Sequence, residues 1–111
     1  MSTIATDAIV RIVAADTIER IEALAPVEGG FAIIDTILTQ AGARVDAARA
    51  LHEKLQLEWD RTVEDLDDAA EYALNLQIEM AQDLAAVESA AFARIRDTAE
   101  ALRDPAALAE L

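Results

Sequence analysis

The chain has 111 residues, the size of one domain, and its 22 acidic residues outnumber nine basic residues to give a formal net charge of −13. Such an excess of negative charge disfavours direct binding to nucleic acid or to an anionic membrane surface, and it favours a basic partner. Cysteine is absent, which excludes disulfide bonds and thiol catalysis. We therefore expect a single cytoplasmic domain over 1–111 that neither spans nor binds a membrane.

The composition predicts an all-α fold. Helix-forming residues dominate, and the chain has only three glycines and two prolines. The apolar share is 54%, but much of it is alanine, whose small side chain buries little area. We therefore expect short N-terminal helices packed on a very long helix or helical hairpin, in a bundle that gains stability from a second chain.

Residues 3–25 carry two apolar faces that do not line up on one helix. Ile12 falls on one side of a helical wheel, whereas Ile21 falls on the opposite side. Asp16 and Glu19 have the spacing of a capping box, which marks the start of a helix. The sequence therefore predicts a kink or a restart near Asp16.

Glycine and proline mark the next boundaries. Residues 26–30, Pro-Val-Glu-Gly-Gly, combine a fixed φ with two residues that adopt positive φ readily, which predicts a reversal of the chain. The apolar periodicity of 31–41 predicts a second short helix, which Gly42 would end. Pro105 predicts that 104–111 forms a short tail after the last helix.

The segment 43–103 has no conventional stop signal. Its apolar stripe runs from Leu51 to Leu102 with a mean spacing of about 3.6 residues, the period of a straight helix. The unbroken phase favours one continuous helix. The alternative is a hairpin near Asp60, in which Thr62 and Asp65 would form the capping box of a new helix.

The apolar arc is widest over 70–92, so more than one neighbour must cover it. The first forty residues could cover about half of the long stripe, which predicts an antiparallel dimer or a larger bundle. Apolar side chains of the stripe and two arginines near its end are the candidates for self-association: Leu55, Trp59, Leu66, Met80, Leu84, Arg94 and Arg96.

Acidic residues form the most unusual local pattern. From Thr62 to Ala93 there are eight acids and no lysine or arginine. The candidate binding face consists of Asp60, Glu64, Asp67, Asp68, Glu71 and Glu79. A solvated face that keeps an alanine-rich protein in solution explains this row, but like charges at this spacing repel. A basic protein surface would offset that repulsion, so the row also predicts an adaptor, assembly factor or inhibitor that imitates nucleic acid.

Metal binding is the alternative from another class. Glu64, Asp68 and Glu71 could present oxygen ligands from one helix face. However, the only histidine, His52, is preceded three residues earlier by Arg49, so the Glu-x-x-His motif of a di-iron bundle is absent. No serine lies in a nucleophile motif and no glycine-rich phosphate loop is present. We therefore predict a non-enzymatic protein and assign no catalytic, cofactor or metal residue.

Overall fold

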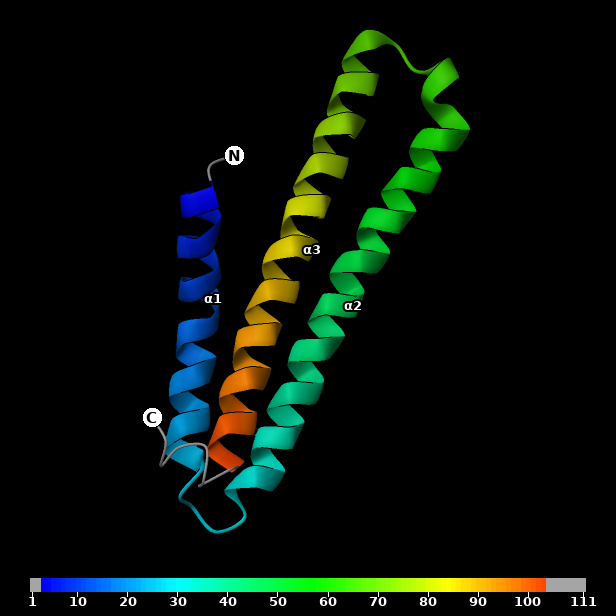
Figure 1. Ribbon diagram of the computed structural model, residues 1–111. Helices are drawn as coiled ribbons and strands as arrows, with labels where there is room; N and C mark the ends of the chain where they lie inside the picture. The colour runs from blue at the N-terminus through cyan, green and yellow to red at the C-terminus, as the bar shows by residue number, and fades with distance from the viewer. Residues whose placement is uncertain (1–2, 104–111) are drawn as a thin grey trace.

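Three helices make up the part of the chain that the structure describes, residues 3–103 of a computed structural model, with side chains described over 7–103 (Figure 1). Helix α1 is Thr3–Leu24, α2 is Gly30–Thr62 and α3 is Asp68–Arg103, with a single 3-10 turn, η1, at Val63–Asp65. The all-helical prediction is confirmed. The predicted tail 104–111 lies outside the described residues.

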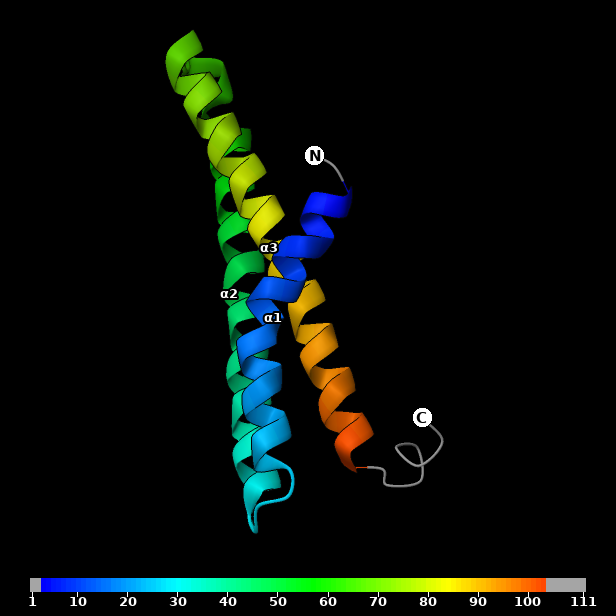
Figure 2. The same ribbon diagram turned by 90° about the vertical axis from the view of Figure 1, so that its left-hand side faces the viewer.

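Helices α2 and α3 form a long antiparallel hairpin, and α1 packs against only part of it (Figures 1 and 2). The molecule is accordingly elongated, with extents of 59 × 28 × 19 Å. Helix α1 contacts α3 more extensively than it contacts α2, and it crosses α3 at an angle in Figure 2. The hairpin therefore has a half where three helices pack together and a half that projects beyond α1.

Helix α1 is continuous, so the predicted break near Asp16 is wrong. Its buried side chains follow one helical face: Val10, Ala14, Thr17 and Ile21. The apolar residues of the other face, such as Ile9 and Ile12, remain largely exposed. The two apolar faces in the sequence therefore correspond to one covered and one uncovered side of a continuous helix. Asp16 forms an ion pair with Arg20 one turn later at 3.1 Å, inside the helix, and starts no new one.

The predicted turn at 26–30 is confirmed, and it depends on both of its glycines. Gly29 has φ 75°, a left-handed conformation that disfavours other residues. Gly30 begins α2 so close to the end of α1 that a Cβ atom would stand 1.8 Å from the carbonyl oxygen of Leu24. A side chain at position 30 would therefore force the two helices apart.

Helix α2 continues through Gly42, so the predicted end of a short helix at 41 is wrong. Among the described residues only Gly29 has a positive φ, which means that Gly42 lacks the conformation of a helix-ending glycine. It lies within α2 beside the ring of Phe92. Packing against α3 carries the helix past a residue of low helix propensity.

The segment 43–103 forms a hairpin and not the continuous helix. The chain turns through η1 and an extended Leu66, with φ −86° and ψ 141°. The side chain of Asp67 then accepts a hydrogen bond of 2.8 Å from the backbone N–H of Ala70 and so caps α3. The predicted capping box at Thr62 is wrong, because the Thr62 hydroxyl donates to the carbonyl of Glu58 at 2.7 Å.

The line of contact between α2 and α3, here called the seam, follows a seven-residue repeat. Its buried and half-buried members alternate at spacings of three and four: Ile34, Leu38, Ala41, Val45, Ala48, His52, Leu55 and Trp59 on α2; Leu74, Ile78, Ala81, Ala85, Glu88, Phe92, Ile95 and Ala99 on α3. This is the period of a coiled coil, about 3.5 residues. The longer period in the sequence arose from consecutive steps of four residues, from Leu51 to Val63 and from Val87 to Ile95, at which the stripe passes from one flank of a helix to the seam.

The main hydrophobic core lies where all three helices meet. Its buried members are Val10, Ala14, Ile21, Ile34, Ala91, Ile95 and Ala99. At the same end, Arg103 forms an ion pair with Asp35, and its guanidinium lies 5.0 Å from the centre of the Phe31 ring. These contacts hold the end of α3 against the start of α2. The opposite end of the hairpin projects as a two-helix structure.

Candidate functional site

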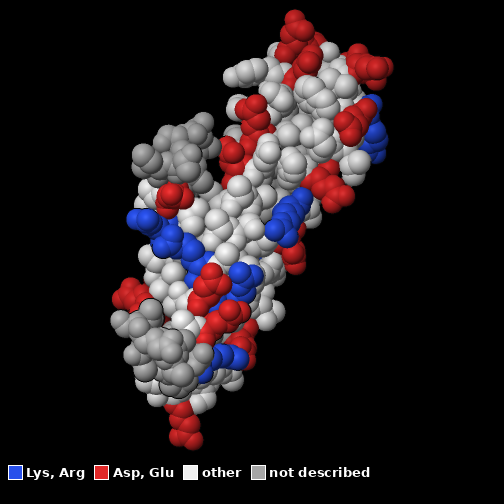
Figure 3. Space-filling model, in the orientation of Figure 1, with Lys and Arg blue, Asp and Glu red and all other residues white. Residues whose placement is uncertain are grey.

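The projecting end of the hairpin carries a concentrated negative charge. Residues 50–80 include nine acidic and two basic residues. In Figure 3 red side chains gather over this end, at the top of the view, whereas most of the blue ones lie over the middle and lower parts. The ion pairs found within residues 7–103 involve Asp16, Asp35, Glu88 and Asp97, so none of them neutralises an acid of the hairpin end.

The predicted acidic row is a cluster around a turn and not a line along one helix. Asp60 lies in the last turn of α2, Glu64 lies in η1, Asp67 caps α3, and Asp68 and Glu71 lie in its first turn. All are exposed except Glu71, which is half-buried. The remaining member, Glu79, is exposed but lies about 16 Å farther along α3 from Asp68, at about 1.5 Å per residue.

Some of these acids have a structural role. Asp67 holds the first turn of α3 by its capping hydrogen bond. Asp68 and Glu71 lie at the positive end of the α3 dipole, which favours negative charge there. Asp60 accepts only a long hydrogen bond, 3.5 Å, from the side chain of Gln56. Asp60 and Glu64 are therefore the acids with the least structural reason to be there.

A hollow of about 420 Å³ opens beside this cluster. We call it the tip hollow; its lining residues are Trp59, Asp68, Glu71, Tyr72 and Asn75. Trp59 is half-buried at the seam, whereas Tyr72 is 70% exposed and forms an outer wall. Two aromatic rings beside two carboxylates form a surface that suits a guanidinium or ammonium group.

Tyr72 and Asn75 are members of this site that the sequence prediction missed. Asp68, Tyr72 and Asn75 follow one another at spacings of four and three, so they share one flank of α3. That spacing was readable in the sequence. Their proximity to Trp59 was not, because it depends on the turn that brings the end of α2 beside the start of α3.

The structure offers no support for the metal alternative. Over 7–103 no three histidine, cysteine, aspartate or glutamate side chains are placed to hold a metal ion together. Glu64, Asp68 and Glu71, the predicted oxygen ligands, therefore do not converge. His52 is half-buried at the seam, and the hydroxyl of Ser89 accepts a hydrogen bond of 3.1 Å from Arg49.

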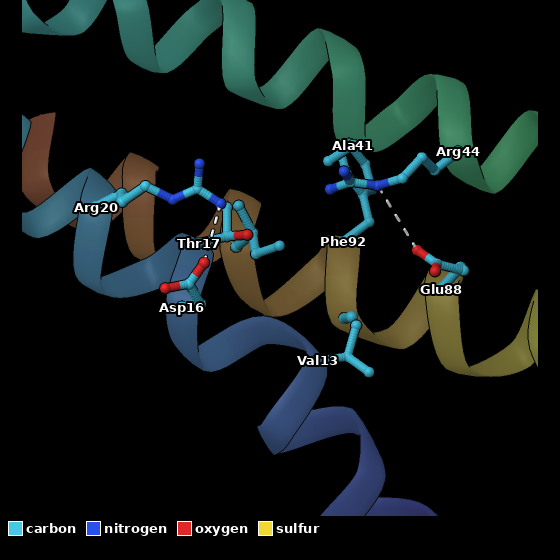
Figure 4. Close-up of a pocket in the computed structure, with 10 residues that line it drawn as sticks. Val13, Asp16, Thr17, Arg20, Ala41, Arg44, Glu88 and Phe92 are labelled. Carbon is cyan, nitrogen blue, oxygen red and sulfur yellow. Dashed lines mark hydrogen bonds and ion pairs between the residues drawn. The ribbon is translucent and has the colours of Figure 1, made fainter.

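A second hollow, of about 310 Å³, lies between the three helices and includes arginines from two of them (Figure 4). Arg20 comes from α1 and is paired with Asp16 at 3.1 Å. Arg44 comes from α2 and lies 4.0 Å from Glu88 of α3. Because each guanidinium faces a carboxylate of this chain, the hollow offers no unpaired positive charge to an anion.

The residues predicted for self-association fall into three separate places. Leu55, Met80 and Leu84 lie together in a groove between α2 and α3. Trp59 lines the tip hollow, and Leu66 is half-buried in the turn. Arg94 and Arg96 are exposed near the other end of α3. There Arg96 pairs with its neighbour Asp97 at 3.4 Å and lies 5.8 Å from the centre of the Phe92 ring.

None of the helices described has the length and apolar character needed to cross a membrane. Comparison of the chain with models of protein families, with curated proteins and with solved structures gives no match.

Proposed function

We propose that the protein acts by binding, as a non-enzymatic helical module whose acidic hairpin end engages a basic protein surface. The observation that carries this proposal is the tip hollow, where Trp59 and Tyr72 lie beside the carboxylates of Asp68 and Glu71. The negative charge of the hairpin end alone is also explained by the need to keep the protein in solution. Aromatic rings placed among unpaired carboxylates are what recognition of a cationic side chain requires.

The tip hollow suits arginine better than other side chains. A guanidinium can stack on an aromatic ring while its N–H groups donate to carboxylates, and it loses less hydration energy than an ammonium. A cation on an aromatic face contributes about 0.5–2 kcal/mol, depending on its exposure to water. Several such side chains, or one within a basic surface, would be needed for stable binding.

The surrounding acids would guide the partner to the hollow. Charges act over about 8 Å at physiological ionic strength, so Asp60 and Glu64 would accelerate the encounter with a basic surface rather than fix its final geometry. A nucleic-acid-binding protein is one class of partner with such a surface. On this proposal, the hairpin end occupies the groove of that partner as an imitation of phosphate charge and acts as an inhibitor or adaptor.

The test compares two variants of equal net charge as baits in a cell extract. Asp60→Lys with Glu64→Lys reverses two exposed acids of the hairpin end, and Glu19→Lys with Glu22→Lys reverses two exposed acids of α1. Basic proteins should be retained by the wild type and by the α1 variant, retained more weakly by the hairpin-end variant, and released by salt. Equal retention by both variants would contradict the proposal.

A further inference from the structure

Helix α1 is too short to cover the hairpin on which it packs. It has 22 residues, against 33 in α2 and 36 in α3. At about 1.5 Å per residue, close to 20 Å of the hairpin extends beyond α1. The N-terminal end of α1 also leans across α3 and away from α2 (Figure 2). Within residues 3–103, no third helix covers α2 and α3 beyond that end.

The face of α3 that α1 covers continues into this space. Ala91 belongs to the three-helix core and Val87 packs against it. Seven residues before each of these lie Leu84 and Met80, which the coiled-coil period places on the same flank of α3. The apolar character therefore continues for two more turns after the covering helix has ended.

Together with α2 these residues form a groove of about 520 Å³, here called the apolar groove: Leu51, Leu55, Gln77, Met80, Ala81 and Leu84. Met80 is 63% exposed, Leu84 is 46% exposed and Leu51 is 44% exposed. Large apolar side chains with this exposure would be buried if a third helix were present.

Helix α1 carries an exposed apolar ridge next to the groove. We define the α1 ridge as Ile9, Ile12 and Val13, which are 43%, 75% and 41% exposed. Ile9 and Val13 also line a smaller hollow, of about 270 Å³, together with Leu84. Leu84 therefore borders the apolar groove and also the α1 ridge at Ile9 and Val13, and so joins the two into one apolar surface.

We propose that a second copy of this chain covers the surface, with the α1 ridge of each copy seated in the apolar groove of the other. A two-fold axis beside Leu84 exchanges ridge and groove, so both copies use the same surface and the assembly closes as a dimer. Each hairpin is then covered along its length, first by its own α1 and then by the α1 of the second copy.

The size of the surface fits a dimer. Six large apolar side chains, each between 41% and 75% exposed, present on the order of 500 Å², the upper end of what a monomeric protein exposes in one patch. With a polar rim this approaches the roughly 800 Å² that each partner buries in a standard interface. The six residues are Ile9, Ile12, Val13, Leu51, Met80 and Leu84.

Charge selects the antiparallel arrangement. The hairpin end is the most acidic part of the chain, so two parallel copies would place two such ends side by side. The proposed two-fold axis crosses the middle of the hairpin and directs the two acidic ends in opposite directions. Repulsion between them is then smallest, whereas the apolar surfaces meet near the axis.

The proposed dimer leaves the tip hollow free. Asp68 and Asn75 lie on one flank of the α3 seam, whereas Gln77 and Leu84 lie on the other. The inference is therefore independent of the proposed function: loss of the dimer would not abolish the tip hollow, and loss of basic-partner binding would not separate the copies.

The first test is the mass in solution of the full chain over a hundredfold range of concentration. The expected mass is twice the 11.9 kDa of one chain. Ile12→Glu and Met80→Glu should each give monomers, because a carboxylate would be buried in the interface. Leu57→Glu is the matched control, since Leu57 is 54% exposed and lies on α2 outside the apolar groove, and it should remain dimeric. A monomeric wild type, or a dimer that survives both substitutions, overturns the proposal.

The second test locates the axis. The chain has no cysteine, so Leu84→Cys introduces a single thiol beside the proposed two-fold axis. Under mild oxidation this variant should form a disulfide-linked dimer, whereas Leu57→Cys should not. Efficient cross-linking through position 57 and not 84 would mean that the copies meet on another face, which overturns the proposed interface even if the protein is a dimer.

Discussion

Gly42 faces Phe92 across the seam, with 3.7 Å between the Phe92 Cε2 atom and the place where a Cβ on Gly42 would stand. That distance is an ordinary van der Waals contact. Alanine therefore fits at position 42 in an α2 that already has helical backbone geometry there. Gly42→Ala should stabilise the protein by about 0.5–1 kcal/mol, because alanine loses less backbone entropy on folding. Thermal unfolding measures this, and a lower midpoint would mean that the seam cannot accept the methyl group.

Gly30→Ala should have the opposite effect. The added Cβ would meet the Leu24 carbonyl carbon at 2.8 Å and its oxygen closer still, and both atoms belong to rigid backbone. We expect a loss of about 1–3 kcal/mol, typical of overpacking, in urea unfolding. Gly29→Ala is the companion variant: it meets no atom within 4 Å and should lose only about 1–2 kcal/mol because of its positive φ. Equal stability of Gly30→Ala and wild type would contradict the close approach of α1 and α2.

Asp67→Ala should lower stability by about 1 kcal/mol, because it removes the capping acceptor of the Ala70 N–H. Asp67→Asn retains an acceptor at the same place and should restore most of the loss. Hydrogen exchange at the first turn of α3 should report the same order. If alanine and asparagine behave alike, charge at this position matters more than the capping hydrogen bond.

Ile33 and Ile34 provide a matched pair for the core. Ile34 is 0% exposed within the three-helix core, and Ile33, its neighbour in α2, is 50% exposed. Ile34→Ala should cost about 2–5 kcal/mol through lost burial and the cavity left behind. Ile33→Ala should cost far less. Similar losses for both variants in denaturant titrations would place α2 in a different rotation about its axis.

Occupation of the tip hollow can be followed through Trp59, the only tryptophan of the chain. A short arginine-rich peptide should change its fluorescence, and the effect should weaken as salt is added. Tyr72→Ala should weaken the peptide affinity by about 2-fold to 30-fold, equivalent to about 0.5–2 kcal/mol of cation–aromatic contact, and Tyr72→Phe should retain it. Since Tyr72 is 70% exposed, its removal should leave stability nearly unchanged. A peptide response that is the same in wild type and Tyr72→Ala would assign the binding to charge alone.

The elements that the sequence predicted best were those with local chemical signals. Pro26 and Gly29 predicted the first turn because fixed and positive φ values are properties of single residues. The second turn contains neither proline nor glycine; it depends on an extended Leu66 followed by the Asp67 cap, a signal hidden among neighbouring acids. Gly42 led to the opposite error. The sequence predicted a helix end there, but packing against α3 keeps α2 helical through a residue of low helix propensity.

The candidate sites were predictable only in part for a similar reason. Leu55, Met80 and Leu84 were identified from periodicity, and the structure places them in one groove. The tip hollow brings Trp59 beside Tyr72 and Asn75, which a wheel drawn for one continuous helix cannot do. The same holds for α1, because the way it crosses α3 decides which of its two apolar faces is buried.

The three-helix core joins the two ends of the described chain: Ala14 and Ile21 of α1 pack in one cluster with Ile95 and Ala99 near the end of α3. During synthesis, α1 therefore emerges long before its partner residues exist. The α2–α3 hairpin can form from its turn as soon as the first half of α3 is made, since those contacts are close in sequence. Docking of α1 must wait for the last turns of α3. Until those turns are made, the apolar face of α1 is uncovered and prone to aggregation.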